Sequence, residues 1–380
     1  MGWGIYIHIP FCRQKCFYCD FPSFAGRDHQ MEAYTKALCC EIAAQGSFVK
    51  RQKAGAASTV YIGGGTPTAL PMEQLTAIIR DVRQSFLLAE DAEFTIEANP
   101  GTVTKENLQQ LRACGVNRLS FGIQSFEDVL LKRIGRIHTA KQAENAVKAA
   151  QAAGFSNVSL DLMYGLPGQS LEQLSASVEQ ALELQIQHIS IYGLQVEAGT
   201  VFARQQEQGR LELPSEEMAE AMYDYMTETL PANGYERYEI SNFARPGFES
   251  RHNLSYWQDV PYLGLGAAAH SYWQGQRLEN TADPGRYTEC VEHGWSPAHE
   301  EEPMTKEIAM EEFCFLALRT VRGLDAEKFA GKFGCPLETA YGEVLQRMRQ
   351  KGLLEVENGF WRLTKLGMKY GNIVFEAFIR

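Results

Sequence analysis

Hydrophobic and polar positions follow two alternating patterns over the first half of this 380-residue chain. Short runs rich in Ile, Val, Tyr and Phe, bounded by Gly or Pro, predict β-strands. Stretches with the apolar spacing of amphipathic helices lie between them. The expected strands cover residues 3–9, 58–65, 93–100, 117–125, 157–165 and 188–196, and the clearest helices cover 71–86, 104–115 and 139–154. A repeated order of strand and helix predicts a parallel sheet.

The repeat count predicts an α/β fold, in the form of a partial (β/α)6 barrel. The strands read as nearly continuous apolar runs, as expected for a parallel sheet that is covered on both faces. Active sites of such folds form at the carboxyl ends of the strands. The polar and glycine residues at those ends are His8, Cys12, Gly63 to Thr66, Glu97, Asn99, Gln124, Ser125, Asp161 and Gln195.

The pattern changes near residue 210. Residues 213–240 predict a helix followed by a short strand, and residues 250–273, rich in Gly and aromatic side chains, predict a loop. The last 75 residues or so predict three helices and then a hairpin that turns at Asn358-Gly359, which is the order of a winged helix.

These patterns divide the chain into three parts. Residues 1–208 form the partial barrel, and residues 209–304 are expected to be a linker and aromatic segment of the C-terminal domain. Residues 305–380 form a winged-helix-like end, so the C-terminal domain is mainly helical. About two domains suit a chain of this length.

Composition and charge exclude several classes of protein. Hydrophobic residues make up 45% and charged residues 22%, which is ordinary for a globular protein, and the net charge of -11 opposes nucleic-acid binding. Residues 305–380 hold twelve Lys and Arg against ten Asp and Glu, which favours a structural or partner-docking module over a DNA-binding one. No apolar run of about 18 residues and no signal-peptide pattern occurs, so the expected location is the cytoplasm.

Three of the nine cysteines, Cys12, Cys16 and Cys19, fall within eight residues directly after the first predicted strand. The other six are scattered or sit on a predicted helix, and small buried apolar positions account for them. Thiolates are soft ligands for zinc or iron-sulfur clusters. Structural zinc usually takes four protein ligands, and no fourth cysteine lies nearby. An iron cluster whose fourth ligand is not protein explains three cysteines better.

This C-x3-C-x2-C loop resembles the signature of radical S-adenosylmethionine (SAM) enzymes. The resemblance implies a [4Fe-4S] cluster on the three cysteines, with a fourth iron that binds the amino and carboxylate groups of SAM. The segment "YIGGGTPTAL", after the second strand, is similar to the motif of this superfamily that meets the SAM amino group. Its glycines permit close backbone approach, and we expect free N–H groups in the "TPT" that follows.

The resemblance narrows to the oxygen-independent coproporphyrinogen III oxidase group. It rests on "IYIHIPFC", "GGGTPT", "IEANP", "FGIQSF", "IGRIH", "DLMYGLPGQ" and "HISIYGLQ", and it covers nearly the whole chain. Glu97 or Asp161 could accept hydrogen bonds from ribose hydroxyls, and Arg136 could pair with a carboxylate. The SAM contacts that the resemblance implies are Tyr6, Tyr18, Gly65, Thr66, Glu97, Gln124, Arg136 and Asp161.

Two departures from the oxidase pattern separate this chain from the oxidases themselves. Phe21 stands where they carry a further cysteine, and Cys12 follows only eleven residues where they have a longer N-terminal arm. The segment "RHNLSYW" instead resembles a heme-chaperone branch of the group. That branch implies heme binding without oxidase activity, and transfer of heme to acceptor hemoproteins such as membrane respiratory proteins. The cluster and SAM would then support transfer or the formation of a homodimer.

His252 in that segment is the expected heme contact, because neutral imidazole is a common axial ligand of heme iron, and His270 is a rival. Two alternatives stay open. One is an active oxidase that removes two propionate carboxyls from coproporphyrinogen III. The other is a SAM-dependent regulator that acts through the winged helix.

Overall fold

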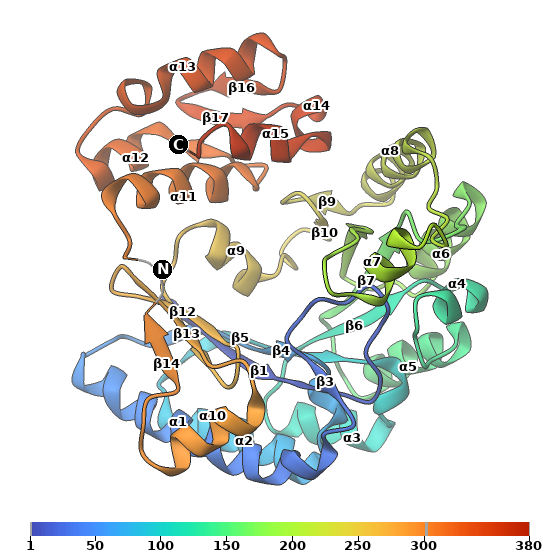
Figure 1. The fold of residues 1–380 in the computed structure, drawn as a ribbon, viewed down its shortest axis with the longest axis vertical. Helices are drawn as coiled ribbons and strands as arrows, with labels where there is room; N and C mark the ends of the chain where they lie inside the picture. The colour runs from blue at the N-terminus through green and yellow to red at the C-terminus, as the bar shows by residue number, and fades with distance from the viewer. Residues whose placement is uncertain (1, 301–302, 380) are drawn as a thin grey trace.

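A computed structural model describes residues 2–300 and 303–379 of the chain. Six parallel strands form the centre of its main sheet, and the α/β expectation is confirmed (Figure 1). Strand β5 begins at Leu88, five residues before the expected start, because Leu88 already pairs with Ala57. The six strands are β1 Trp3–Ile9, β4 Ala57–Gly64, β5 Leu88–Ala98, β6 Arg118–Gln124, β7 Val158–Tyr164 and β8 His188–Gly193.

Alternate side chains of these strands point to opposite faces of the sheet. On the outer face, residues such as Ile5 and Ile62 are fully buried in the main core. Helices α1, α2, α3 and α5 lie along this face (Figure 1). Thr104, Thr139 and Ser170 each close a capping box at a helix start, which explains why α3, α5 and α6 begin where they do. The helices are α1 Met31–Arg51, α2 Met72–Ser85, α3 Lys105–Ala113, α4 Asp128–Arg133, α5 Ala140–Ala152 and α6 Leu171–Glu183.

The inner face of the six strands carries polar side chains, which differs from the expected apolar run on both faces. Its buried members include Thr59, Glu93, Arg118, Ser159 and His188. Thr59, Glu93, Ser159 and His188 have hydrogen-bond partners on neighbouring strands or in the segment that covers this face, whereas Arg118 Nε has none among the described residues.

Six further strands extend the sheet at both edges. The full order is β14-β13-β12-β11-β1-β4-β5-β6-β7-β8-β10-β9, in which β11 runs parallel to β1 and β10 antiparallel to β8. Helix α10 packs against α1 below this extension (Figure 1). The added elements are α7 Val201–Glu207, α8 Glu216–Ala232, β9 Glu236–Arg237, β10 Asn242–Ala244, β11 Tyr262–Leu265, β12 His270–Trp273, β13 Gln276–Asn280, α10 Pro284–Glu292 and β14 Ala298–Glu300. The helix and short strand expected within residues 213–240 are therefore confirmed.

The loop expected over residues 250–273 is wrong. Helix α9, Arg251–Trp257, begins there because the side chain of Ser250 accepts a hydrogen bond from the backbone N–H of Asn253. Gly264 lies in β11 although glycine is usually a turn signal, since a Cβ there would lie 1.9 Å from the carbonyl oxygen of His270. Close approach of two strands, and not flexibility, explains this glycine.

The C-terminal residues form a compact unit with its own core, at the top of Figure 1. Asn358 and Gly359 have φ angles of 51° and 82°, which confirms the predicted hairpin turn between β16 and β17. The elements are α11 Lys306–Leu318, β15 Leu324–Asp325, α12 Ala326–Phe333, α13 Leu337–Gln350, β16 Leu354–Glu357, β17 Phe360–Leu363, α14 Lys365–Lys369 and α15 Gly371–Glu376.

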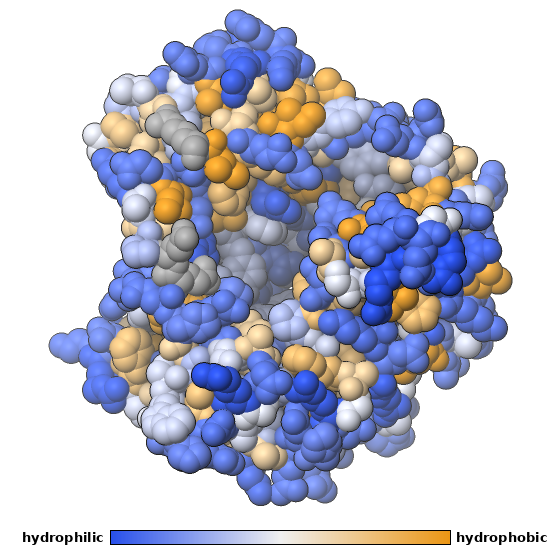
Figure 2. Space-filling view, viewed as in Figure 1, coloured by the Kyte–Doolittle hydropathy of each residue, from blue (hydrophilic) through white to orange (hydrophobic). Residues whose placement is uncertain are grey.

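This unit sits above the inner face of the sheet, with α9 between them (Figure 1). Arg319 lies 4.5 Å from the ring centre of Trp257 at the end of α9, and the backbone N–H of Ile240 donates to the Arg319 carbonyl. Figure 2 shows the surface hollowed between the upper unit and the sheet.

The division at residues 208 and 304 stays a prediction, and its outer ends, Met1 and Arg380, lie outside the described residues. Within residues 2–300 and 303–379, every helix is too short or too polar to cross a membrane.

Candidate functional site

The three clustered cysteines lie on a loop that starts at the carboxyl end of β1. Two hydrogen bonds hold this loop, one to the residue after α4 and one within the loop. The backbone N–H of Phe17 donates to the carbonyl of Ile134 over 3.0 Å, and Lys15 Nζ donates to the carbonyl of Phe21 over 2.9 Å. Burial raises the pKa of the Cys12 and Cys19 thiols. Thiolates in such a setting need a cation or cluster to stabilise them.

A cavity of about 450 Å³ opens beside the loop, at the carboxyl ends of the parallel strands. This volume is in the usual range for small-molecule sites. Ten of the twelve predicted site residues line it: Cys12, Cys16, Cys19, Tyr18, Gly65, Thr66, Glu97, Gln124, Arg136 and Asp161. The sheet therefore brings together residues spread over 150 positions of sequence. Tyr6 and His252 do not line the cavity.

The glycine turn after β4 lies against the cysteine loop. A Cβ on Gly65 would lie 2.7 Å from the carbonyl oxygen of Phe11 and 3.1 Å from Cys12 Sγ, so only glycine fits. The expected free N–H of Thr66 is wrong, because that group donates to the Phe11 carbonyl over 2.8 Å. The Gly65 N–H is likewise bonded, to the carbonyl of Ile9. Only other atoms of the turn, such as carbonyl oxygens, are left to meet a ligand, and these suit an ammonium group.

Two carboxylates, Glu97 and Asp161, line the same cavity as the cysteines. Burial raises the pKa of Glu97 to about 7, with the nearby Asp161 carboxylate adding to the rise. Burial likewise raises the pKa of Asp161, whose Oδ1 accepts from Ser120 Oγ over 3.5 Å. Acceptors held in this way are suited to bind hydroxyl groups of a ligand.

Arg136 is a buried positive charge of the cavity, which Lys15 also lines. Its Nη1 lies 3.5 Å from Cys16 Sγ, and its Nη2 donates to the carbonyl of Gly122. Its Nε is buried and has no hydrogen-bond partner among the described residues. A buried guanidinium with an unused donor is suited to a carboxylate ligand.

Gln124 occupies a strained position at the end of β6. Its φ of 70° lies in the left-handed region, and the pairing of β6 with β7 shifts register between Gly122 and Gln124. Such strain in a non-glycine residue is typical of functional sites, since regular pairing would hold the strand straight.

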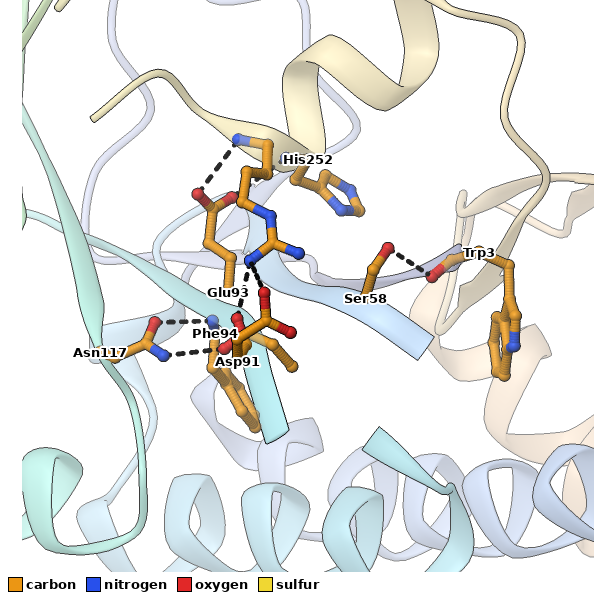
Figure 3. A network of polar contacts seen from close by, with 9 residues as sticks. Trp3, Ser58, Asp91, Glu93, Phe94, Asn117 and His252 are labelled. Carbon is orange, nitrogen blue, oxygen red and sulfur yellow. Dashed lines mark hydrogen bonds and ion pairs between the residues drawn. The ribbon is translucent and has the colours of Figure 1, made fainter. Parts of the chain in front are cut away.

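His252 lies on the inner face of the sheet, away from the cavity, and is 1% exposed. Figure 3 shows it at the start of α9, above β5 and Glu93. Its Nδ1 is 2.8 Å from Thr59 Oγ1 and its Nε2 is 2.8 Å from the Tyr256 hydroxyl. The expected heme contact through His252 stays a prediction, and it requires one of these bonds to break. The rival His270 is half exposed on β12.

Sequence reasoning missed several residues that line the cavity. Tyr192 and Met163 stand at the ends of β8 and β7, and Glu197 follows β8. Their position at or just after the ends of predicted strands could have identified them as cavity residues. Phe21 lies at the mouth with 62% of its side chain exposed, where the oxidase pattern has cysteine.

The cavity is suited to a cluster with SAM. Three thiols suit a cluster, and the guanidinium beside Cys16 and the two carboxylates suit the amino acid and ribose groups of SAM. Among residues 2–300 and 303–379, no three Cys, His, Asp or Glu side chains are placed to hold a single metal ion.

The fold and this cavity define a protein of the radical SAM class. The radical SAM superfamily model matches residues 6–181, and the model of the HemN C-terminal domain matches residues 304–369. The coproporphyrinogen III oxidase HemN of Escherichia coli, a radical SAM enzyme, has the same fold. Its structure gives a TM-score of 0.86 at 23% identity, covering 99% of this chain and 90% of that one.

Full-length relatives narrow the class to one family. Heme chaperone HemW of Bacillus subtilis is 40% identical over 375 residues, which cover 98% of both chains. Heme chaperone HemW of Escherichia coli is 34% identical over 392 residues, covering 99% of this chain and 98% of the other. The chain belongs to the HemW family of radical SAM proteins.

Proposed function

We propose that this protein binds a [4Fe-4S] cluster, SAM and heme, and passes the heme to acceptor hemoproteins. The carrying observation is the convergence of Cys12, Cys16 and Cys19 with Arg136 and Glu97 on one cavity, in a chain whose full-length relatives are named heme chaperones.

In this proposal each of the ten predicted residues that line the cavity has a task. The three thiolates hold the cluster, which supplies one-electron chemistry and an open iron when bound. Arg136 pairs with the SAM carboxylate through its unused Nε, while Glu97 and Asp161 accept from the ribose hydroxyls. Gln124 bonds the ribose or the carboxylate. Gly65 and Thr66 let the turn approach the amino group, and Tyr18 covers the cluster side.

Heme is the cargo in this proposal, and its acceptors include membrane respiratory proteins. We propose that the protein works in the cytoplasm and that the cluster and SAM support transfer, in a homodimer. No nucleic acid is expected as a partner, since the chain carries a net charge of -11.

The test uses anaerobic, cluster-loaded protein. Heme is titrated and followed by its absorbance, an apo-hemoprotein is added as acceptor, and coproporphyrinogen III with SAM and a reductant is assayed in parallel. Stoichiometric heme uptake followed by transfer, without protoporphyrinogen, is the expected result. Formation of protoporphyrinogen would favour the oxidase alternative, and failure to take up heme would overturn the proposal.

A further inference from the structure

Helix α9 is fastened to the inner face of the sheet at its first turn. The Glu93 carboxylate accepts from the backbone N–H of Arg251 and of His252, each over 3.0 Å (Figure 3). These N–H groups have no partner within the helix, and a carboxylate at a helix N-terminus is electrostatically favoured. The Arg251 side chain adds an ion pair of 3.1 Å to Asp91. The position of α9 is thus set by strand β5.

The imidazole of His252 is held on both sides by the bonds to Thr59 and Tyr256 described above. Burial lowers its pKa to about 3, with the buried Arg118 adding to the effect. The ring is therefore neutral at ordinary pH. Space around it is limited, since a Cβ on Gly4 would lie 3.4 Å from His252 Cε1. The ring has one orientation in this packing.

The His252 ring packs against two tyrosine rings, and each ring of the three stacks with the other two. The His252 ring centre lies 5.1 Å from that of Tyr61 and 6.4 Å from that of Tyr6, with interplanar angles of 22° and 26°. The two tyrosine rings are themselves stacked at 6.3 Å. Tyr6 and Tyr61 are register partners on β1 and β4, so the imidazole packs over neighbouring strands.

Two hydrogen-bond chains run from this group to the cavity. The Tyr61 hydroxyl donates to Glu97 Oε1 over 2.6 Å. The Tyr6 hydroxyl lies 3.0 Å from His8 Nδ1, and His8 Nε2 lies 2.9 Å from the carbonyl oxygen of Pro22, three residues after Cys19. One chain reaches a carboxylate of the cavity, and the other reaches the end of the cysteine loop.

We infer that His252 is a positioning residue for the cofactor cavity: through the stacked rings of Tyr61 and Tyr6 it orients Glu97 and the cysteine loop. The inference rests on the proposed SAM binding, and it assigns the segment "RHNLSYW" a task at the cavity in addition to any contact with heme. Supporting groups of this kind commonly change affinity about 10- to 100-fold when removed.

A matched control exists on the same face of the sheet. His188 on β8 is also fully buried, and its ring nitrogens lie 2.7 Å from Ser159 Oγ and 2.7 Å from the Tyr238 hydroxyl. Its ring neighbour is Tyr238, at 5.6 Å, and not Tyr61. Loss of His188 therefore removes an equivalent buried imidazole without touching the bond to Glu97.

The experiment measures the dissociation constant of SAM by calorimetry on anaerobic, cluster-loaded protein. We expect His252→Ala to raise it about tenfold and His252→Phe, which keeps a ring in the stack, to restore most of the loss. Tyr61→Phe removes only the hydroxyl that bonds Glu97 and also weakens binding. The double variant His252→Ala/Tyr61→Phe is expected to be little worse than either single change, because both act on one carboxylate. His188→Ala leaves the constant within about twofold, because its link to α9, through the Tyr238 hydroxyl that accepts from the Ser250 N–H over 3.3 Å, does not include the Tyr61–Glu97 bond.

Each outcome decides the inference. Unchanged SAM affinity in His252→Ala overturns it, as does an equal loss in His188→Ala, which would show general loosening. Should His252→Ala not fold, His252→Leu, which fills the space but removes the ring, takes its place, and full additivity of His252→Leu with Tyr61→Phe overturns the inference. A wild-type protein that takes up its cluster but not SAM refutes the proposed function first, and the inference with it. Heme uptake is recorded in parallel, and loss of heme with intact SAM affinity would show instead that His252 serves only heme.

Discussion

The hydroxyl of Tyr61 donates a hydrogen bond of 2.6 Å to Oε1 of Glu97, and so joins the stacked rings beneath α9 to the cofactor cavity. Without this donor the carboxylate would face the nearby Asp161 with less compensation, since the Tyr61 bond favours the ionised form. The orientation and the charge of Glu97 thus depend on a residue that does not line the cavity.

The raised pKa of Glu97 predicts a pH-dependent stability. Its pKa is about 7 in the folded protein against 4.5 as the reference, so the folded state binds the proton more tightly. The ionised carboxylate therefore destabilises the fold above pH 7. This penalty shrinks as the pH falls from 7 to 4.5 and is absent below that.

Glu97→Gln is therefore expected to stabilise SAM-free protein by up to about 3 kcal/mol at pH 8, and by little at pH 4.5. Urea unfolding at the two pH values measures the difference, with Glu90→Gln on the exposed start of β5 as the control. The same change should weaken SAM binding. Equal stability of variant and wild type at pH 8 would contradict the role given to burial.

Three positions of the cysteine loop are predicted to be required for cluster binding. Cys12→Ser, Cys16→Ser and Cys19→Ser should each abolish the violet absorbance of cluster-loaded protein, because a hydroxyl is a poor ligand for iron in a cluster. Cys114→Ser, at the end of α3, should retain it. Iron and sulfide content gives an independent measure, and equal losses in all four variants would show that the ligands are assigned wrongly.

A side chain at Gly65 is predicted to clash with the backbone beside the cysteine loop. Gly65→Ala puts a methyl group 2.7 Å from the Phe11 carbonyl, so the turn must move away from Cys12. We expect SAM binding to fall at least tenfold. Gly55→Ala, where nothing lies within 4 Å of the added carbon, is the matched control. The idea fails if the two variants bind SAM alike.

Glu41 is predicted to contribute to the free energy of unfolding and not to the cofactor cavity. This buried carboxylate on α1 accepts from the Gly266 N–H, the Asn280 amide and the Tyr287 hydroxyl, over 2.6 to 2.8 Å. Glu41→Ala leaves three buried donors unpaired and should cost about 3 to 5 kcal/mol in chemical unfolding. Glu32→Ala, exposed on the same helix, should change stability little. A small effect of Glu41→Ala would mean that water replaces the carboxylate.

Most of the fold and most residues of the cavity could be predicted from local sequence patterns. Cys12 and Gly65 follow strands, and Glu97 lies at the end of one, that could be predicted from a few neighbouring residues, and a parallel sheet brings such strand ends together. The setting of His252 could not be read in this way. Its helix is fastened by Glu93, 159 positions earlier, and the glycines after it resemble turn signals although Gly264 serves strand packing.

The pairing of β11 with β1 sets an order for folding during synthesis. Gly4 pairs with Tyr262, so the first strand, which pairs with β4 on one side, waits for its second partner, about 260 residues away. At ribosomal rates of about 5 to 20 residues per second, the cysteine loop is made roughly 15 to 50 s before the sheet beside it is complete. Helix α9, which lies over the ring stack, is also made in this last part of the delay. A cluster donated before that point would meet exposed thiols on an unfinished support, so the architecture favours cluster insertion after β11 has paired with β1.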